Sequence, residues 1–301
     1  GYIIMSYKIV EKKKLNDVVY LMDIEAPRVA HSAKPGQFII VIIDEKGERM
    51  PLTIADYDKE RGTVTIVFQV VGFSSKKLGK LEVGDSIKDF VGPLGQPSEF
   101  IYEDIDELKK KKIIFIAGGV GAAPVYPQVK WLHEHGVDVD VIIGARTKDL
   151  IIFEDKMDKV AKNLYMCTDD GSYGFHGNVT VMLDELVTNR GMEYDQAIVI
   201  GPMIMMKFAC LATKKLNIPT IVSLNTIMVD GTGMCGACRI SIGDDVKFAC
   251  VDGPEFDGWL VNFDEAMKRQ QMFKSEEGRK TLRKQDGPTH SSPNCQIGGK
   301  H

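Results

Sequence analysis

The spacing of apolar residues predicts a first region built from short strands. Between Tyr7 and Phe100, runs rich in β-branched and aromatic residues alternate with breaks such as Pro35-Gly36. Several short strands with no helix between them are typical of a small antiparallel barrel. The clearest strand-forming runs are VVYLMDIEAP, QFIIVII, GTVTIVFQVVG and DSIKDFVGPLG.

From Lys111 the pattern changes to an alternation of buried-strand runs and helical segments. The strand run KKIIFIAGG is followed by the helical segment YPQVKWLHEHG, which ends at Gly136, and then by the strand run VDVDVIIGAR. The alternation continues as far as Asn225. Such regular alternation predicts a parallel sheet connected by crossover helices, so the expected fold class is β barrel plus α/β.

After Asn225 comes a stretch rich in Gly, Asp and Cys that is too short for an ordinary core, and we expect it to fold around a metal. The next segment predicts a helix with Phe263 and Met267 on its apolar side, which we expect near a contact with a partner subunit. The sequence therefore predicts four parts: a barrel over residues 5–103, an α/β domain over 104–225, a metal-binding segment over 226–260, and a helix with a flexible tail over 261–301.

The composition of the 301 residues is that of a folded globular protein, with 44% hydrophobic and 27% charged residues. A formal net charge of -4 gives no basic surface of the kind that nucleic-acid binding requires. No apolar run reaches the roughly 20 residues of a membrane span, and the first residues lack the apolar core of a signal peptide. We therefore expect a cytoplasmic protein that binds neither nucleic acid nor membrane.

Two segments of the predicted barrel carry groups that suit a pyrophosphate. The segment Arg49–Thr53 closes one predicted strand, and Gly72–Ser75 follows another that ends in Gln69-Val70-Val71. An arginine fork binds phosphate oxygens, a glycine lets backbone N–H groups approach them, and two hydroxyls add donors. Taken separately, Arg49 is better explained as a solvated charge at a strand end and Gly72 as a plain turn, so only the two segments together favour a pyrophosphate site.

A glycine-rich turn, Gly118–Pro124, lies between the strand run IIFIA and a helix. Glycines at such a turn let a pyrophosphate sit at the helix N-terminus, where free N–H groups favour an anion. The spacing is not G-x-G-x-x-G, so the usual dinucleotide fingerprint is not claimed. Thr168–Gly171 and Gly201–Met203 follow other strands and are expected on the same carboxyl edge of the sheet, where ligands bind. Arg146, after the second strand of this domain, would tolerate a 2′-phosphate and leaves NADP open.

The strongest chemical signal is the spacing of Cys235, Cys238 and Cys250 behind Asp230. Cysteines with four and then two intervening residues, followed by a distant fourth, hold a plant-type [2Fe–2S] cluster, and here an aspartate occupies the first position. Either the carboxylate completes the cluster, or three cysteines hold a zinc ion or an incomplete site.

The segments Arg49–Thr53, Gly72–Ser75 and Gly118–Pro124 resemble, in this order, the motifs of the ferredoxin–NADP reductase superfamily. The resemblance implies FAD on the barrel and a nicotinamide nucleotide on the α/β domain, with Thr53 near the reactive nitrogen of the flavin. In that superfamily a cysteine often precedes the Gly-Pro pair, and here Ile200 stands there, so no thiol is expected to assist hydride transfer. The residues expected at FAD are Arg49, Pro51, Leu52, Thr53, Gln69, Val70, Gly72, Ser74 and Ser75. Those expected at the nucleotide are Gly118, Gly119, Gly121, Pro124, Arg146, Asp170, Gly201, Pro202 and Met203.

The succession of flavin barrel, nucleotide domain and cysteine segment is similar to the electron-transfer subunits of dihydroorotate dehydrogenases. With Asp230 in first position, it is closer to the small subunits of NADH-dependent reduced ferredoxin:NADP oxidoreductases. The resemblance implies that NAD(H) exchanges a hydride with FAD, and that single electrons pass to a cluster held by Asp230, Cys235, Cys238 and Cys250. A larger glutamate-synthase-like flavin and iron–sulfur subunit would accept them for electron bifurcation with ferredoxin and NADP.

Two other classes of function stay open at this point. One is an electron-transfer subunit of a dihydroorotate dehydrogenase, a family that places a cysteine where this chain has Asp230. The other is a non-redox regulatory module stabilised by zinc, which would give a colourless protein.

Overall fold

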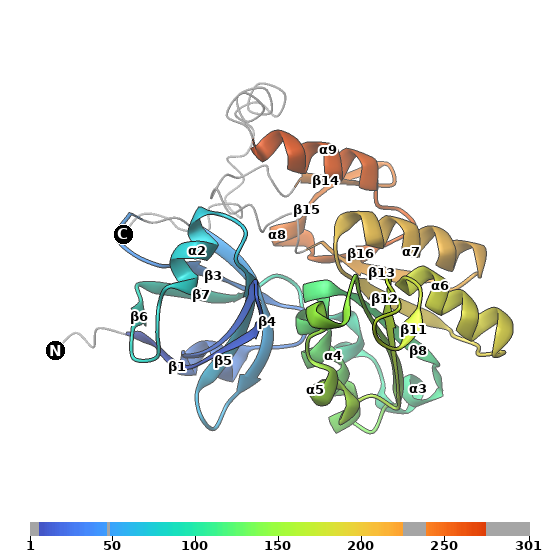
Figure 1. Ribbon diagram of the computed structural model, residues 1–301, viewed down its shortest axis with the longest axis horizontal. Coiled ribbons are helices and arrows are strands. Elements are labelled where there is room, and N and C mark those ends of the chain that lie inside the picture. Colours follow the sequence, from blue (N-terminus) through green and yellow to red (C-terminus); the bar gives the residue numbers. More distant parts are fainter. Residues whose placement is uncertain (1–5, 47–48, 225–238, 275–301) are drawn as a thin grey trace.

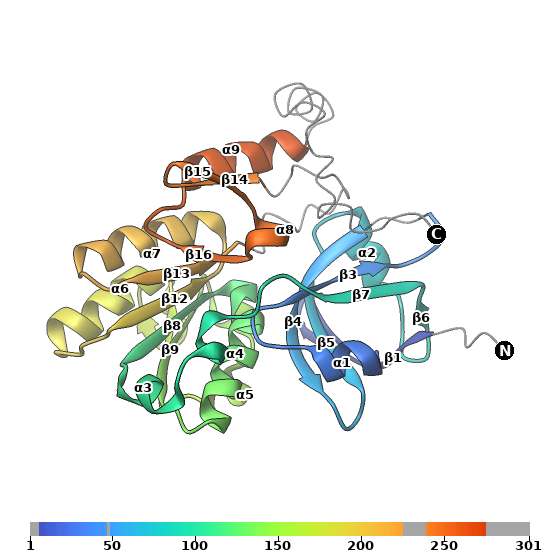
Figure 2. The same cartoon turned by 180° about the vertical axis from the view of Figure 1, so that it is seen from behind.

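The computed structural model describes residues 6–46, 49–224 and 239–274. An antiparallel barrel and an α/β domain lie side by side, the first in blue and the second in green to yellow (Figure 1). Residues 239–274, the C-terminal segment, are drawn in orange and lie against the α/β domain in both views (Figures 1 and 2).

The described strands of the barrel are antiparallel to their neighbours, in the order β6-β1-β2-β5-β4-β3-β7. Successive residues of a strand point to opposite faces, so alternate apolar side chains such as Ile9, Ile39 and Phe90 fill the interior. Short helices α1 (Pro27–Ser32) and α2 (Phe73–Gly79) follow β2 and β5. The strands are β1 (Tyr7–Asn16), β2 (Val19–Glu25), β3 (Phe38–Ile42), β4 (Arg49–Asp58), β5 (Thr63–Gln69), β6 (Ser86–Ile87) and β7 (Asp89–Leu94).

One detail of the predicted barrel is wrong: the segment Arg49–Thr53 opens a strand instead of closing one. The chain reverses after β3, and β4 then pairs antiparallel with it, with Arg49 opposite Ile42 and Thr53 opposite Phe38. The reversal begins after Ile43, at the polar residues Asp44 and Glu45, whereas the prediction took Arg49–Thr53 as the end of the preceding strand.

The predicted parallel sheet of the second domain is confirmed, in the order β11-β10-β9-β8-β12-β13-β16. Helices α3, α4 and α5 pack on one face and α6 and α7 on the other. The connection from the barrel contains η1 (Glu99–Tyr102) and α3 (Ile105–Lys110). The strands are β8 (Ile113–Gly118), β9 (Val139–Ala145), β10 (Asn163–Thr168), β11 (Phe175–His176), β12 (Gln196–Ile200) and β13 (Thr220–Ser223). The helices are η2 (Gly119–Gly121), α4 (Ala122–Glu134), η3 (Lys148–Leu150), α5 (Glu154–Asp158), α6 (Val179–Asp184), the π-helical turn η4 (Glu185–Asn189) and α7 (Met203–Lys215).

The C-terminal segment shares the core of the α/β domain. Strand β16 (Glu255–Asp257) extends the parallel sheet by pairing antiparallel with β13. The other elements are the hairpin β14 (Arg239–Ile242) and β15 (Asp245–Phe248), and the helices α8 (Ala249–Asp252) and α9 (Phe263–Lys274).

Helix α9 packs on α7 and β14, so its apolar side is covered within this chain, and a partner contact near Phe263 and Met267 stays a prediction. Phe263 is only 6% exposed, and Met267 packs against the same apolar cluster. Lys207 on α7 also forms an ion pair with Asp264 at 2.7 Å. The apolar face of α9 is therefore used within this chain. No helix in the described ranges is both long and apolar enough to cross a membrane.

Candidate functional site

The first predicted flavin segment begins β4, and its side chains alternate between two faces. Leu52 is 6% exposed and points into the barrel core, so a cofactor could touch only its backbone. Arg49, Pro51 and Thr53 are half-buried and share the opposite face of the strand. This row of a guanidinium, an apolar ring and a hydroxyl fits a flavin with its pyrophosphate.

The second predicted flavin segment forms the turn at the start of α2. The Ser75 hydroxyl accepts hydrogen bonds from the N–H groups of Val71 and Gly72 at 3.0 Å each and donates one to the Gly72 carbonyl at 3.1 Å. A hydroxyl has one proton and two lone pairs, so these bonds use all of its capacity. Ser75 therefore closes the turn, a different role from the phosphate donor suggested by the sequence. Gly72 is open: no described atom lies within 4 Å of a Cβ built on it.

An ion pair brings the two segments to the same end of the barrel. Lys77 on α2 pairs with Asp44, which lies in the connection between β3 and β4. Ser74 is half-buried in the first turn of α2, whereas Gln69 is exposed at the end of β5 and Val70 is half-buried just after it. The predicted flavin residues thus come from neighbouring elements, although they are far apart in the sequence.

The glycine turns after β8 and β12 touch each other. A Cβ built on Gly201 would lie 3.3 Å from the Cα atom of Gly118, and one built on Gly121 would lie 2.8 Å from the carbonyl carbon of Ile200. Such close approach requires glycine. The strands β8 and β12 are neighbours at the point where the strand order reverses, and open α/β sheets bind ligands in the crevice at this point.

The other residues of these turns differ in what they offer a ligand. Gly119 has a φ of 56°, in the left-handed region, and no described atom lies within 4 Å of a Cβ built on it. Pro124 is half-buried in the first turn of α4, and Pro202 is exposed just before α7. Met203 is 5% exposed and belongs to the core, so only its backbone could contact a nucleotide.

Arg146 and Asp170 lie together at the carboxyl ends of β9 and β10. The Asp170 N–H group donates to the Arg146 carbonyl at 3.2 Å, and both side chains are exposed. The Asp170 carboxylate accepts the Ser172 N–H group at 2.9 Å. Hydrogen bonds from Ser172 lower the pKa of Asp170, so this side chain stays anionic at neutral pH.

Of the four predicted cluster ligands, Asp230, Cys235 and Cys238 lie outside the described residues. Cys250 is half-buried on α8 and packs beside the main apolar cluster. Two other cysteines, Cys167 and Cys210, are buried in the core, and burial raises the pKa of each thiol to about 12. A thiol that resists ionisation is a poor metal ligand, so these two cysteines are core residues and not candidate cluster ligands.

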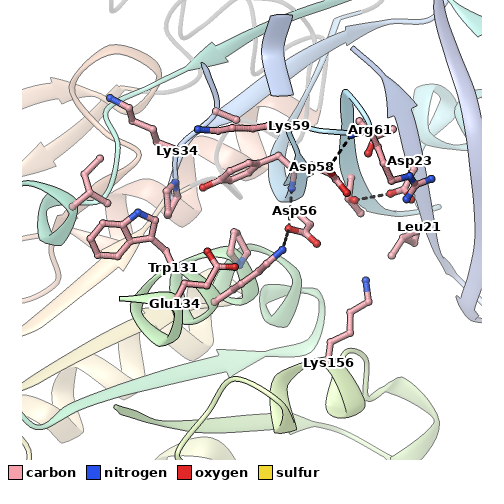
Figure 3. A pocket seen from close by; sticks show the side chains of 18 of the residues that line it. Leu21, Asp23, Lys34, Asp56, Asp58, Lys59, Arg61, Trp131, Glu134 and Lys156 are labelled. Atoms are coloured by element: carbon pink, nitrogen blue, oxygen red, sulfur yellow. Dashed lines mark hydrogen bonds and ion pairs between the residues drawn. The ribbon is translucent and has the colours of Figure 1, made fainter. Parts of the chain in front are cut away.

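A cleft of about 860 Å³ lies on another side of the molecule, between the β4–β5 hairpin and the helices α4 and α5 (Figure 3). Its wall mixes both signs of charge: Lys130 pairs with Asp56 at 3.0 Å, while Arg61 lies near Asp23. None of the predicted site residues lines this cleft. We therefore assign neither cofactor to it.

One buried polar cluster was not expected from the sequence. Glu255 on β16 accepts hydrogen bonds from the Ser98 hydroxyl at 2.7 Å and from the Gln128 side-chain amide at 2.9 Å. These residues are 157 and 127 positions away from Glu255, so no local pattern could have found the contact.

Comparisons with known proteins agree with this architecture. Residues 225–262 match the family model described as the iron–sulfur cluster binding domain of dihydroorotate dehydrogenase B. Residues 115–211 match the model of the oxidoreductase NAD-binding domain.

Two curated relatives match almost the whole chain. A protein of Thermotoga maritima named as a homolog of the dihydroorotate dehydrogenase B (NAD(+)) electron transfer subunit is 44% identical over 270 residues, covering 90% of this chain and 92% of the relative. A Clostridium beijerinckii protein described only by its position in the adh 3′ region is 67% identical over 293 residues, covering 97% of this chain and 99% of the relative.

A solved structure of NADH-dependent reduced ferredoxin-NADP oxidoreductase, described for its flavin-based electron bifurcation, is 41% identical with a TM-score of 0.81. The match covers 94% of this chain and 98% of that chain. A ferredoxin NADP+ reductase from Neisseria gonorrhoeae, with a TM-score of 0.56, 15% identity and coverage of 70% and 90%, shares the fold. The chain therefore belongs to the family of dihydroorotate dehydrogenase B electron transfer subunits and their homologues, oxidoreductases with the ferredoxin–NADP reductase fold, an NAD-binding domain and an iron–sulfur cluster binding domain.

Proposed function

We propose that this protein is the small subunit of an electron-bifurcating NADH-dependent oxidoreductase and moves electrons between NAD(H) and a [2Fe–2S] cluster through FAD. A hydride carries two electrons, whereas a cluster accepts one. One NADH and two oxidised clusters give NAD+, one proton and two reduced clusters. When bound, FAD supplies the conversion between two-electron and one-electron transfer.

The observation that carries this proposal is the position of β3 between the predicted flavin row and the C-terminal segment. Phe38 on β3 lies opposite Thr53 on β4. Phe38 also belongs to the apolar cluster against which Phe248 and Cys250 pack. A Cβ built on Gly95 would lie 2.9 Å from the Phe38 ring and 3.1 Å from Pro254 of the C-terminal segment. A cluster bound through Cys250 would therefore lie close to a flavin bound along Arg49, Pro51 and Thr53, as electron transfer between them requires.

In this proposal each part of the chain has a binding or positioning task. Arg49 binds the pyrophosphate of FAD, Thr53 donates a hydrogen bond near the reactive nitrogen, and the open backbone at Gly72 admits the cofactor. The crevice between Gly118 and Gly201 holds the nicotinamide nucleotide at the switch point of the sheet. No acid–base side chain is needed for hydride transfer.

Arg146 bears on the choice between NAD and NADP. The side chain is exposed at the carboxyl end of β9, so it could accept the 2′-phosphate of NADP. The similarity to an NADH-dependent oxidoreductase favours NAD, and we propose NADH as the preferred donor.

We propose that a larger flavin and iron–sulfur subunit receives the electrons and docks on α7. Ile204, Phe208 and Leu211 follow one another at helical spacing and are 49%, 52% and 57% exposed. A stripe of exposed apolar residues marks an interaction surface. Helix α7 also packs on α9 of the C-terminal segment, so a subunit docked there would lie next to the part of the chain that holds the cluster.

A dihydroorotate dehydrogenase partner is the second candidate, because relatives carry that name. Two experiments test the proposal. Anaerobic addition of NADH to the purified protein should bleach the flavin and reduce the cluster. Purification of the native complex should then show whether the attached subunit oxidises dihydroorotate or reduces ferredoxin and NADP.

A further inference from the structure

A buried polar junction joins the three parts of the fold at Glu255. Ser98 lies in the connection between the barrel and the α/β domain, Gln128 lies on α4, and Glu255 lies on β16 of the C-terminal segment. The Glu255 atom Oε1 accepts from the Ser98 hydroxyl at 2.7 Å and from the Gln128 Nε2 atom at 2.9 Å. Ser98 is 0% and Gln128 1% exposed, so both donors are shielded from water.

Backbone hydrogen bonds reinforce the same junction. The Gln96 N–H group donates to the Gly253 carbonyl at 2.8 Å, and the Leu224 N–H group donates to the Pro254 carbonyl at 2.8 Å. The connection after β7 and the end of β13 are therefore both tied to the two residues that precede Glu255.

The junction is tightly packed on the side of Gly36. A Cβ built on Gly36 would lie 2.9 Å from the backbone nitrogen of Ser98 and 3.1 Å from the Glu255 carboxylate. Gly36 has a φ of 90°, so the chain turns tightly against the junction at a position that favours glycine. Glu255 is half-buried and borders a cleft of about 510 Å³, whereas the side chains of Ser98 and Gln128 are buried. Removal of the Glu255 acceptor therefore leaves two buried donors unsatisfied.

We propose that Glu255 is a positioning residue that fixes the C-terminal segment, and with it the cluster ligand Cys250, against the connection between the barrel and the α/β domain. The positioning role of Glu255 follows from the hydrogen bonds of the junction alone. The effect of Glu255 on electron transfer rests on the proposed function. The barrel and the α/β domain keep a separate contact, because α4 packs against β4 and Lys130 pairs with Asp56 at 3.0 Å. Loss of Glu255 should therefore loosen the C-terminal segment more than it separates flavin from nicotinamide.

The test compares the purified holoprotein with Glu255→Ala, Glu255→Gln and the control Glu99→Gln, which removes an exposed carboxylate next to the junction. Hydrogen exchange of peptides over residues 94–102 reports the connection directly. We expect at least fivefold faster exchange in Glu255→Ala, and rates within twofold of the parent protein in Glu255→Gln and Glu99→Gln, because a glutamine oxygen can accept both hydrogen bonds. Ser98→Ala serves as a second variant if Glu255→Ala does not fold, and we expect the same direction of change.

The second readout separates the two electron-transfer steps. In stopped-flow experiments with NADH, Glu255→Ala should bleach flavin at a rate within twofold of the parent protein, while cluster reduction slows at least fivefold and Glu255→Gln restores it. Unchanged exchange over residues 94–102 in both Glu255→Ala and Ser98→Ala would overturn the positioning role. If exchange changes but the holoprotein contains no flavin or cluster, the proposed function fails while the junction stands.

Discussion

At the scale of single residues, the two kinds of glycine in the predicted sites should respond differently to a methyl group. A Cβ at Gly121 would meet the backbone of Ile200, which cannot move without disturbing β12, whereas a Cβ at Gly72 meets no described atom within 4 Å. We expect Gly121→Ala to lower the free energy of unfolding by at least about 2 kcal/mol. Gly72→Ala should change it by less than about 0.5 kcal/mol but weaken FAD binding at least fivefold, because the methyl group occupies the approach to the backbone. Urea unfolding and flavin titration measure the two effects. Equal stability losses in both variants would contradict this reading of the glycines.

Glu255 provides a prediction about pH. Burial raises the pKa of this carboxyl from its ordinary value of 4.5 to about 7, and the charge of Glu99 acts in the same direction. Below pH 4.5 the group is neutral in both folded and unfolded chains. Between pH 4.5 and 7 the unfolded chain ionises while the folded chain stays protonated, so stability falls as pH rises and then levels off.

The matched variant is Glu255→Gln, which has no charge to bury. The free energy of unfolding of this variant minus that of the parent protein should increase by on the order of 2 to 3 kcal/mol from pH 5 to pH 8. Urea unfolding at the two pH values measures this difference, with Glu60→Gln, which removes an exposed carboxylate in the turn between β4 and β5, as the control. A constant difference between Glu255→Gln and the parent at all pH values would show that Glu255 does not titrate in this window.

Asp230 provides a test of the cluster ligands. A carboxylate is a harder ligand than a thiolate and changes the potential of the iron that it binds. We expect Asp230→Cys to keep a [2Fe–2S] cluster with a shifted potential, whereas Asp230→Ala and Cys250→Ala lose cluster content. Iron analysis and redox titration followed by electron paramagnetic resonance measure both. An unchanged cluster in Asp230→Ala would assign the fourth ligand to another residue.

At the scale of elements, the periodicity of apolar residues predicted the strands and helices whose formation depends on their own sequence. The strand β8 is buried along its whole length, and its continuous apolar run was recognised for that reason. Strand β1 was not among the clearest runs, because its half-exposed side chains include several lysines. Helix α4 begins four residues before the predicted YPQVKWLHEHG, since Pro124 was taken as part of a turn and is tolerated in the first turn of a helix.

Elements that depend on distant contacts were missed or misjudged. Strand β16 has three residues and exists through its pairing with β13, about 35 residues earlier in the chain. The apolar side of α9 was correctly recognised, but the sequence could not show that α7 already covers it. Ser75 shows a local contact that the motif did not reveal, because its hydroxyl forms hydrogen bonds within the turn.

The exposed stripe of α7 leads to a prediction about assembly. Phe208→Glu places a charge in the centre of the stripe, so it should weaken binding of the larger subunit at least tenfold without unfolding the chain, because Phe208 is 52% exposed. The control Lys215→Glu also places a carboxylate on α7, at an exposed position in its last turn and outside the stripe. Co-purification and size-exclusion chromatography measure the complex. Equal assembly of both variants would place the contact elsewhere.

At the scale of the whole molecule, the packing of the three parts brings the predicted binding regions together. Strand β3 lies between the predicted flavin row and the C-terminal segment, and the sheet crevice opens between β8 and β12. Mutual placement of the cofactors therefore follows from how the barrel, the α/β domain and the C-terminal segment pack. The order of motifs in the sequence predicted which cofactors bind, but not the junction at Glu255 that holds the parts together.

The most direct test is an anaerobic titration of the purified protein with NADH, followed by visible absorption and electron paramagnetic resonance. We expect flavin absorption that bleaches with NADH, a [2Fe–2S] signal that appears as the cluster is reduced, and a much weaker response to NADPH at equal concentration. A colourless protein containing zinc, or a flavin that bleaches without any cluster signal, would contradict the proposed transfer of electrons from NADH through FAD to the cluster.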